Sequence, residues 1–144
     1  MRLWTEAYFH EGEGGRATPY EQRDFEKAMA AGTMLVAGPP GAALGVVVLV
    51  APKTSGMAVA RGEEAELCLL AVSSLERRKG TGRALVERCT DLARERDWPA
   101  IALWSRPYQA AAHRLYESLG YRRLPGRDET DATGFARLVF RLEL

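Results

Sequence analysis

Runs of apolar residues divide this chain into strands. The segments 44–50 and 65–72 are rich in β-branched and aliphatic side chains, which is typical of buried strands. Residues 135–144 alternate between apolar and polar, which predicts a strand with one buried face. The side chains expected to face inward are Leu138, Phe140, Leu142 and Leu144, and those expected to face outward are Arg137, Arg141 and Glu143. Shorter strands are predicted at residues 34–37, 101–104 and 121–124.

Three other segments have helical periodicity. Residues 18–30 begin with Thr-Pro and carry a glutamate three residues after the threonine, which predicts a helix start, and Gly32 is expected to end it. Residues 81–96 place Leu85, Cys89 and Leu92 on one apolar face. Residues 109–119 are followed by Gly120, a residue that favours the end of a helix.

The order of these elements predicts a mixed α/β (α+β) fold in a single domain over residues 1–144. The turn at residues 38–41 joins two neighbouring strands into a hairpin, so the first half of the sheet should be antiparallel. The strand–helix–strand unit from residue 65 to residue 104 should form a right-handed parallel crossover.

Composition excludes several classes of partner. Apolar content is 47%, charged content is 27% and net charge is +1, so nothing draws the chain toward nucleic acid or an anionic membrane. The longest apolar run, residues 42–52, is too short to span a bilayer, and the first residues lack a signal-peptide pattern. We therefore expect a cytoplasmic protein. Cys68 and Cys89 are interpreted as buried thiols, and no group of side chains has metal-ligand spacing.

A basic, glycine-spaced segment precedes the predicted helix at residue 81. It reads Arg77-Arg78-Lys79-Gly80-Thr81-Gly82 and follows an apolar strand. The first N–H groups of a helix lack intrahelical partners, and glycines let an anion approach them. The spacing matches neither a Walker loop nor a dinucleotide fingerprint, and a simple tight turn is an alternative.

Two ordered motifs give the chain a specific resemblance. The segment from Arg77 to Gly82 has the form [Q/R]-x-x-G-x-[G/A]. A later segment has the form N-x-x-A-x-x-L-Y-x-x-L-G-[F/Y], matched at Gln109, Ala112, Leu115, Tyr116, Leu119, Gly120 and Tyr121, with glutamine in place of asparagine. From about residue 35 to the C-terminus, the chain resembles the GNAT N-acetyltransferase family.

The resemblance implies a sandwich around a mostly antiparallel sheet, with helices on both faces. The sheet is splayed between the fourth and fifth family strands. It also implies acetyl-CoA as co-substrate, with no metal. Leu70, Ala71 and Val72 would bind the pantetheine arm. The residues expected near the pyrophosphate are Arg77, Arg78, Lys79, Gly80, Thr81, Gly82 and Arg83. Gln109, Ala112 and Tyr116 would complete the cofactor site.

The family chemistry assigns two catalytic roles. Tyr116 stands at the position of the usual general acid, and a phenol with a pKa of about 10 suits a donor to a developing thiolate. Glu66 is the candidate base, because an unpaired carboxylate in an apolar strand requires an explanation. The alternatives are a packing role for Tyr116, and a paired or solvated Glu66 with a water chain as base. The His113 side chain is expected either to be solvated or to contact residues that in turn contact the ligand.

One departure from the family concerns the N-terminus. Residue 1 lies almost inside what resembles the first family helix, so the first family strand is apparently absent. The strand at residues 34–37 would then be an exposed edge, which invites dimerisation or indicates a wrong start site. We expect acetyl transfer to an amine by direct attack in a ternary complex. The acceptor is expected to be a small molecule, with a protein N-terminus or lysine as runner-up. A non-catalytic acyl-CoA sensor is the alternative. Acceptor specificity is expected in the first helices and the loop at residues 123–133.

Overall fold

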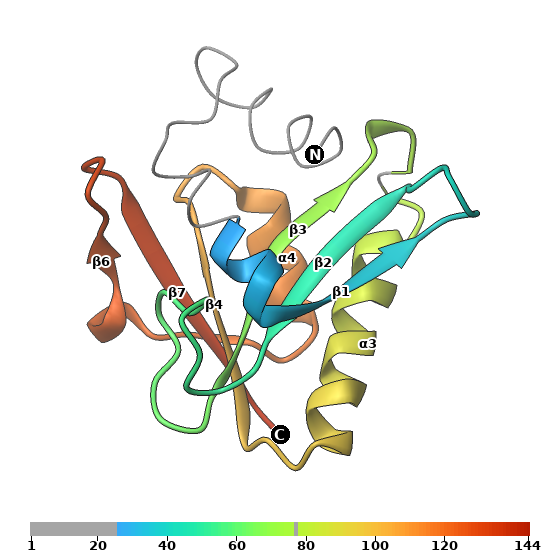
Figure 1. Ribbon diagram of the computed structural model, residues 1–144. Helices are drawn as coiled ribbons and strands as arrows, with labels where there is room; N and C mark the ends of the chain where they lie inside the picture. Colours follow the sequence, from blue (N-terminus) through green and yellow to red (C-terminus); the bar gives the residue numbers. More distant parts are fainter. Residues whose placement is uncertain (1–25, 77) are drawn as a thin grey trace.

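The computed structural model describes residues 26–76 and 78–144 (Figure 1). The chain forms the strands and helices β1 (Gly32–Ala37), β2 (Gly45–Val50), β3 (Ala65–Val72), η1 (Ser74–Glu76), α3 (Thr81–Glu95), β4 (Ala100–Ser105), α4 (Ala110–Ser118), β5 (Arg122–Arg123), η2 (Pro125–Arg127), β6 (Glu129–Thr130) and β7 (Ala136–Glu143). Residues 26–31 are also helical. All of the helices and strands that were predicted within the described residues form.

The strands make one mixed sheet. Its order is β1-β2-β3-β4-β7-β5, with β6 paired to β7. The β3–β4 contact is parallel and the other strand pairs are antiparallel, as the sequence predicts. β1 lies at one end of this order, and Met34 and Val36 on it are exposed. The expected absence of a first family strand falls outside the described residues.

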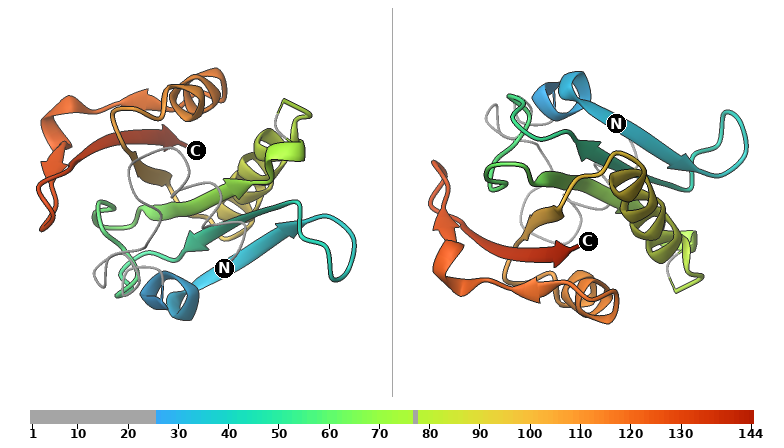
Figure 2. Two further views of the ribbon diagram at one scale, coloured as in Figure 1. Left: turned by 90° about the horizontal axis from the view of Figure 1, so that it is seen from above. Right: turned by 90° about the horizontal axis from the view of Figure 1, so that it is seen from below.

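Helices cover both faces of the sheet, which confirms the expected layers. α3 and α4 lie on the same face, where Leu85, Val86 and Tyr116 pack with Ile101 and Phe140 of the strands (Figure 2). On the opposite face, the helix at residues 26–31 contributes Ala28, which packs against Val48 and Val50 of β2. In the described residues no helix is long and apolar enough to cross a membrane.

The parallel strands β3 and β4 pair over two positions and then separate. Ala65 is opposite Ile101 and Glu66 is opposite Ala102, and from there the two strands diverge (Figure 1). The β2–β3 register shifts between Val46 and Val48, and Leu69 opposite this shift has a φ of 57°. Leu69 is therefore the extra residue of a β-bulge, which bends β3 away from β4. The splayed sheet of the prediction is confirmed.

Two expectations about the C-terminal strands need correction. The face of β7 that carries Arg137, Arg141 and Glu143 was expected to be exposed. Arg137 is only 6% exposed, however, and Val139 on the same face is fully buried. The loop at residues 128–134 contains the strand β6, and residues 121–124 contribute only the two residues of β5. In both places loops pack over the sheet, and alternation along one strand cannot indicate that cover.

Candidate active site

The segment before α3 has the backbone of an anion-binding loop. Gly80 is the N-cap of α3 with a φ of 82°, and Arg78 has a φ of 65°, so two left-handed residues flank Lys79. The first intrahelical bond runs from the Ala84 N–H to the Gly80 carbonyl at 2.9 Å. The N–H groups of residues 81–83 therefore have no carbonyl one turn earlier in the helix to bind. Together with the helix dipole, they favour a phosphate at this point.

Space for a ligand adjoins this helix start. A Cβ built on Gly80 would meet no atom within 4 Å. A cavity of about 320 Å³ is lined by Ala37, Lys79, Gly80, Thr81, Ala84 and Leu85. The Lys79 ammonium lies 3.3 Å from Glu76 with a side chain that is 62% exposed, so it remains close to solvent. Arg83 donates instead to the Ser118 hydroxyl of α4 at 2.7 Å, and Arg77 falls outside the described residues.

The end of β3 offers backbone groups for an extended ligand. Ala71 and Val72 pair with Val46 and Gly45 of β2 on one side. On the other side, strand pairing with β4 ends at Glu66 in the described structure. The predicted pantetheine positions Leu70, Ala71 and Val72 therefore lie along the open edge of the gap. Peptide-like amides can add to such an edge as a further strand.

Tyr116 of α4 packs in the core cluster that includes Leu67 of β3 and Leu103 of β4. Its ring centroid is 5.8 Å from those of Tyr121 and of Phe140 on β7, and its residue is 5% exposed. Burial, with a smaller contribution from nearby Cys68 of β3, raises the pKa of Tyr116 well above its usual value. The phenol is therefore protonated at neutral pH, which is the form that a general acid requires.

Gln109 belongs to a polar cluster at the start of α4. Its side-chain oxygen accepts hydrogen bonds from the Ser105 hydroxyl and the Arg106 N–H, both at 2.8 Å. His113 is partly buried, and its Nε2 lies 3.1 Å from the Ser105 hydroxyl and 2.9 Å from the Arg106 carbonyl. Because the oxygen of Gln109 already accepts these two hydrogen bonds, its amide nitrogen is the group left to donate to a ligand. Ala112 is half-buried against the core.

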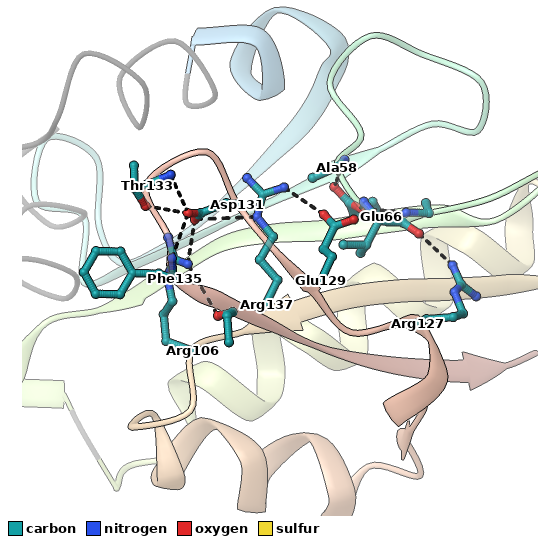
Figure 3. Close-up of polar contacts among 12 residues, drawn as sticks. Ala58, Glu66, Arg106, Arg127, Glu129, Asp131, Thr133, Phe135 and Arg137 are labelled. Atoms are coloured by element: carbon teal, nitrogen blue, oxygen red, sulfur yellow. Dashed lines mark hydrogen bonds and ion pairs between the residues drawn. The ribbon is translucent and has the colours of Figure 1, made fainter.

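Glu66 is held by a loop rather than by an arginine or by water. Its carboxylate accepts N–H groups from Ala58 at 2.8 Å, Val59 at 2.6 Å and Ala60 at 2.9 Å (Figure 3). The side chain is 1% exposed. Burial raises the pKa of Glu66, and the three N–H groups and the charge of Arg137 oppose that rise. This geometry gives the carboxylate an evident structural task, and the base role stays a prediction.

A second carboxylate fixes the same loop from outside. Glu64 accepts a bidentate contact from Arg127 at 2.9 and 3.0 Å, and Arg141 Nε at 3.1 Å. Burial alone would raise the pKa of Glu64, but these arginines and the Arg61 N–H lower it overall. Arg127 also donates to the Val59 carbonyl at 2.6 Å. The loop at residues 58–60 is thus held by hydrogen bonds from its N–H groups to Glu66 and by a hydrogen bond from Arg127 to the Val59 carbonyl.

A third cluster lies at the carboxyl end of β4. The guanidinium groups of Arg106 and Arg137 lie 4.7 and 4.9 Å from the Trp104 ring. Asp131, whose side chain is fully buried, pairs with Arg106 at 2.7 Å, and Glu129 pairs with Arg137 at 3.0 Å (Figure 3). Sequence reasoning did not single out these ion pairs, because their partners are 25 and 8 positions apart. In the described residues no group of side chains has the arrangement of a metal site.

The geometry defines a class: a splayed sheet, a glycine loop at a helix start and a buried tyrosine are the parts of an acyl-CoA cleft. Residues 1–121 match the model of the acetyltransferase (GNAT) family. The chain therefore belongs to that family.

Known proteins similar to this chain agree with that assignment. The N-acetylaspartate synthetase of Rattus norvegicus is 36% identical over 94 residues, which are 62% of this chain and 31% of the rat protein. The match thus spans about a third of that relative. An IAA acetyltransferase from Bacillus cereus has a TM-score of 0.72 at 17% identity, covering 99% of this chain and 91% of that one. A GNAT acetyltransferase from Elizabethkingia anophelis with acetyl-CoA bound has a TM-score of 0.67 at 14% identity, covering 92% and 95%.

We predict that Asp131→Asn lowers stability in a pH-dependent way. Burial disfavours the charge of Asp131, but Thr133, Arg106 and the Phe135 N–H outweigh burial and lower its pKa to about 2. Because the pKa of Asp131 is lower in the folded than in the unfolded protein, its ionised carboxylate stabilises the fold at pH values above the unfolded-state pKa. This stabilisation is lost as the pH falls through the folded-state pKa. The contribution is about 2 kcal/mol at pH 7 and roughly half of that at pH 3. Urea unfolding of both proteins across this range measures it. A difference that stays constant with pH would contradict the assignment.

We predict that Glu66→Gln destabilises the fold, because an amide oxygen cannot replace both carboxylate oxygens. At least one buried N–H loses its acceptor, at a cost of about 1–3 kcal/mol. Glu63→Gln is the control, since Glu63 is 61% exposed and pairs with Lys53 at the surface. Thermal unfolding and the pH–rate profile are measured together. Lower stability with an unmoved acidic limb assigns an anchoring role, and a moved limb assigns the base.

Proposed function

We propose that this protein is an acetyl-CoA-dependent N-acetyltransferase that acts on a small amine. The observation that carries the proposal is the arrangement around the β3–β4 gap. In the described residues, the glycine loop at Gly80 begins the helix that follows β3, the end of β3 has no strand partner on the β4 side, and Tyr116 packs in the core cluster that β3 and β4 share. Family membership and a solved neighbour with acetyl-CoA support the same co-substrate.

Each part of the cleft has a task in binding. The amides of residues 81–83 hold the pyrophosphate, and the positive charge of Lys79 adds to their field. The backbone of residues 70–72 orients the pantetheine arm, and the amide nitrogen of Gln109 donates to it. These contacts direct the thioester toward the point where β3 and β4 part, next to Tyr116.

Acetyl transfer then needs two proton movements. The neutral amine attacks the thioester carbonyl, a C–N bond forms and the C–S bond breaks. Tyr116 donates its proton to the departing sulfur, and the proton of the amine leaves to water or to Glu66. Direct attack without an acyl-enzyme fits the cysteines, because Cys89 is buried in the core and burial raises the pKa of its thiol to about 12.

The small-molecule acceptor rests on one comparison. The name N-acetylaspartate synthetase describes acetylation of an amino acid, and that relative shares 36% identity over the matched region. Calorimetry with acetyl-CoA followed by a CoA-release assay over an amine panel tests the proposal. Binding with turnover is expected. Binding without turnover over the whole panel would favour an acyl-CoA sensor, and failure to bind acetyl-CoA would remove the proposal.

We predict that Tyr116→Phe lowers kcat by roughly two orders of magnitude, because it removes the proton donor to the leaving thiolate. The affinity for acetyl-CoA should change little, since the ring and its packing remain. Tyr121→Phe is the matched control, because Tyr121 packs beside Tyr116 and likewise has a buried hydroxyl. Steady-state kinetics and calorimetry are run on both variants. An unaltered kcat in Tyr116→Phe would exclude the acid role.

A further inference from the structure

Two buried arginines lie over one tryptophan ring. The last β4–β7 pair is Ser105 with Leu138, and Arg106 and Arg137, the residues next to that pair, both place their guanidinium groups over the Trp104 ring. Their side chains are 9% and 7% exposed. Neighbouring like charges repel, and burial strengthens the repulsion. This pair of arginines therefore requires anions beside it.

Asp131 supplies one negative charge, and both of its carboxylate oxygens are already in contact with other groups of the protein. Its Oδ1 accepts from the Thr133 hydroxyl, the Thr133 N–H at 2.9 Å and the Phe135 N–H at 3.1 Å. Its Oδ2 lies 2.7 Å from Arg106 and 4.0 Å from Arg137 Nε. The Asp131 carboxylate thus stabilises the loop that carries it and neutralises the charge of Arg106. These contacts keep the Asp131 carboxylate from pairing with Arg137 as closely as it pairs with Arg106.

Glu129 supplies the second charge from a much looser position. Its Oε1 lies 3.0 Å from Arg137 Nη1, but its side chain is 44% exposed and it belongs to the two-residue strand β6. Exposed carboxylates contribute little to stability when they pair with arginine. The exposed Glu129 side chain can therefore leave, but the buried Arg137 then requires another anion in its place, and Arg137 itself stays against Trp104.

The cluster also lies on the side from which an acceptor can approach. Ile101 and Leu103 of β4 pack toward α3 and α4, so the alternating side chains of Ala102 and Trp104 point to the opposite face. Trp104 lies in the part of β4 that has separated from β3. Trp104 and its two arginines therefore lie on this face of the sheet, beside the separated part of β4.

We propose that Arg137 binds a carboxylate of the acceptor in the place that Glu129 occupies here, which makes the acceptor an amino acid. The proposal rests on the proposed function and names the substrate class for that site. Arg106 and Asp131 act as positioning residues, since their ion pair fixes the loop that carries Glu129 beside Arg137. The flat guanidinium, held on the indole ring, presents a preorganised fork to a carboxylate.

The test compares amino acids with their own α-amides as acceptors. Glycine, L-alanine and L-aspartate are each paired with the corresponding amide, in which the α-carboxylate is neutral. The wild-type protein should prefer the acid in at least one pair by tenfold or more in kcat/KM. Arg137→Met should raise KM for that acid about 10- to 100-fold with kcat little changed, and leave the amide unaffected.

Two further variants separate binding from folding. Glu129→Gln removes the competing carboxylate and should lower KM for the acid several-fold, with no change for the amide. Arg96→Met is the control, because Arg96 also lies over a tryptophan, Trp98, at 5.2 Å but at the far end of α3. It should leave both substrates unaffected. Calorimetry of acid and amide in the presence of CoA gives a readout that is independent of turnover.

The outcomes distinguish the two proposals. Equal kcat/KM and equal binding for acid and amide would overturn the carboxylate site while leaving the acetyltransferase proposal intact. The same conclusion follows if Glu129→Gln raises KM for acid and amide alike, because Glu129 would then attract the amine. Failure of acetyl-CoA to bind would overturn the proposed function itself. Arg137-dependent binding of the acid without turnover would retain the carboxylate site and reject catalysis.

Discussion

The early separation of two parallel strands is the constraint on which the rest of this structure depends. β3 and β4 pair at two positions, and the bulge at Leu69 then turns β3 aside. In a closed sheet the backbone of residues 67–72 would be sealed by its neighbour. Here it stays available, and unpaired backbone groups persist only where water or a ligand satisfies them. The same divergence leaves the end of β3 beside the start of α3 and beside α4, the helix that carries Tyr116. A Cβ on Gly82 would lie 3.5 Å from Leu115 of α4 and 3.6 Å from Val72 of β3, which shows how closely the three elements meet.

Charged side chains on the other face follow a different rule, since burial of each one requires a partner. Glu66 has three backbone N–H groups, Glu64 has two arginines, and Asp131 has its own loop together with Arg106. Ion pairs of this kind rarely add more stability than well-packed apolar side chains would. A face built from them therefore indicates a requirement other than stability, and positioning of loops around an acceptor is such a requirement. Glu129 differs from the others because it alone among these acids is substantially exposed.

Local patterns predicted the fold better than they predicted the site. β3 was expected at residues 65–72 and α3 at 81–96, and both form there within a residue, because periodicity and capping residues are local signals. Arg137 shows where such signals end. Alternation along β7 indicates which face a side chain occupies, but whether that face is covered depends on a loop folded around Asp131. Glu66 is similar: its sequence context indicates that the carboxylate needs partners, yet the N–H groups of residues 58–60 become partners only through tertiary packing. The predicted roles of individual site residues remain predictions for the same reason.

Because the sheet is one layer thick, a thioester in the gap can be reached from both faces. Tyr116 comes from the face that carries α3 and α4, and Trp104 with its arginines comes from the other. The reaction has matching demands, since the sulfur must gain a proton while the amine must lose one. In the mechanism that we propose, an acid on one face and an amine entering from the opposite face would keep these two proton movements apart, so Tyr116 would not protonate the nucleophile. The divergence of β3 and β4 would provide this arrangement, because it opens the sheet to both faces.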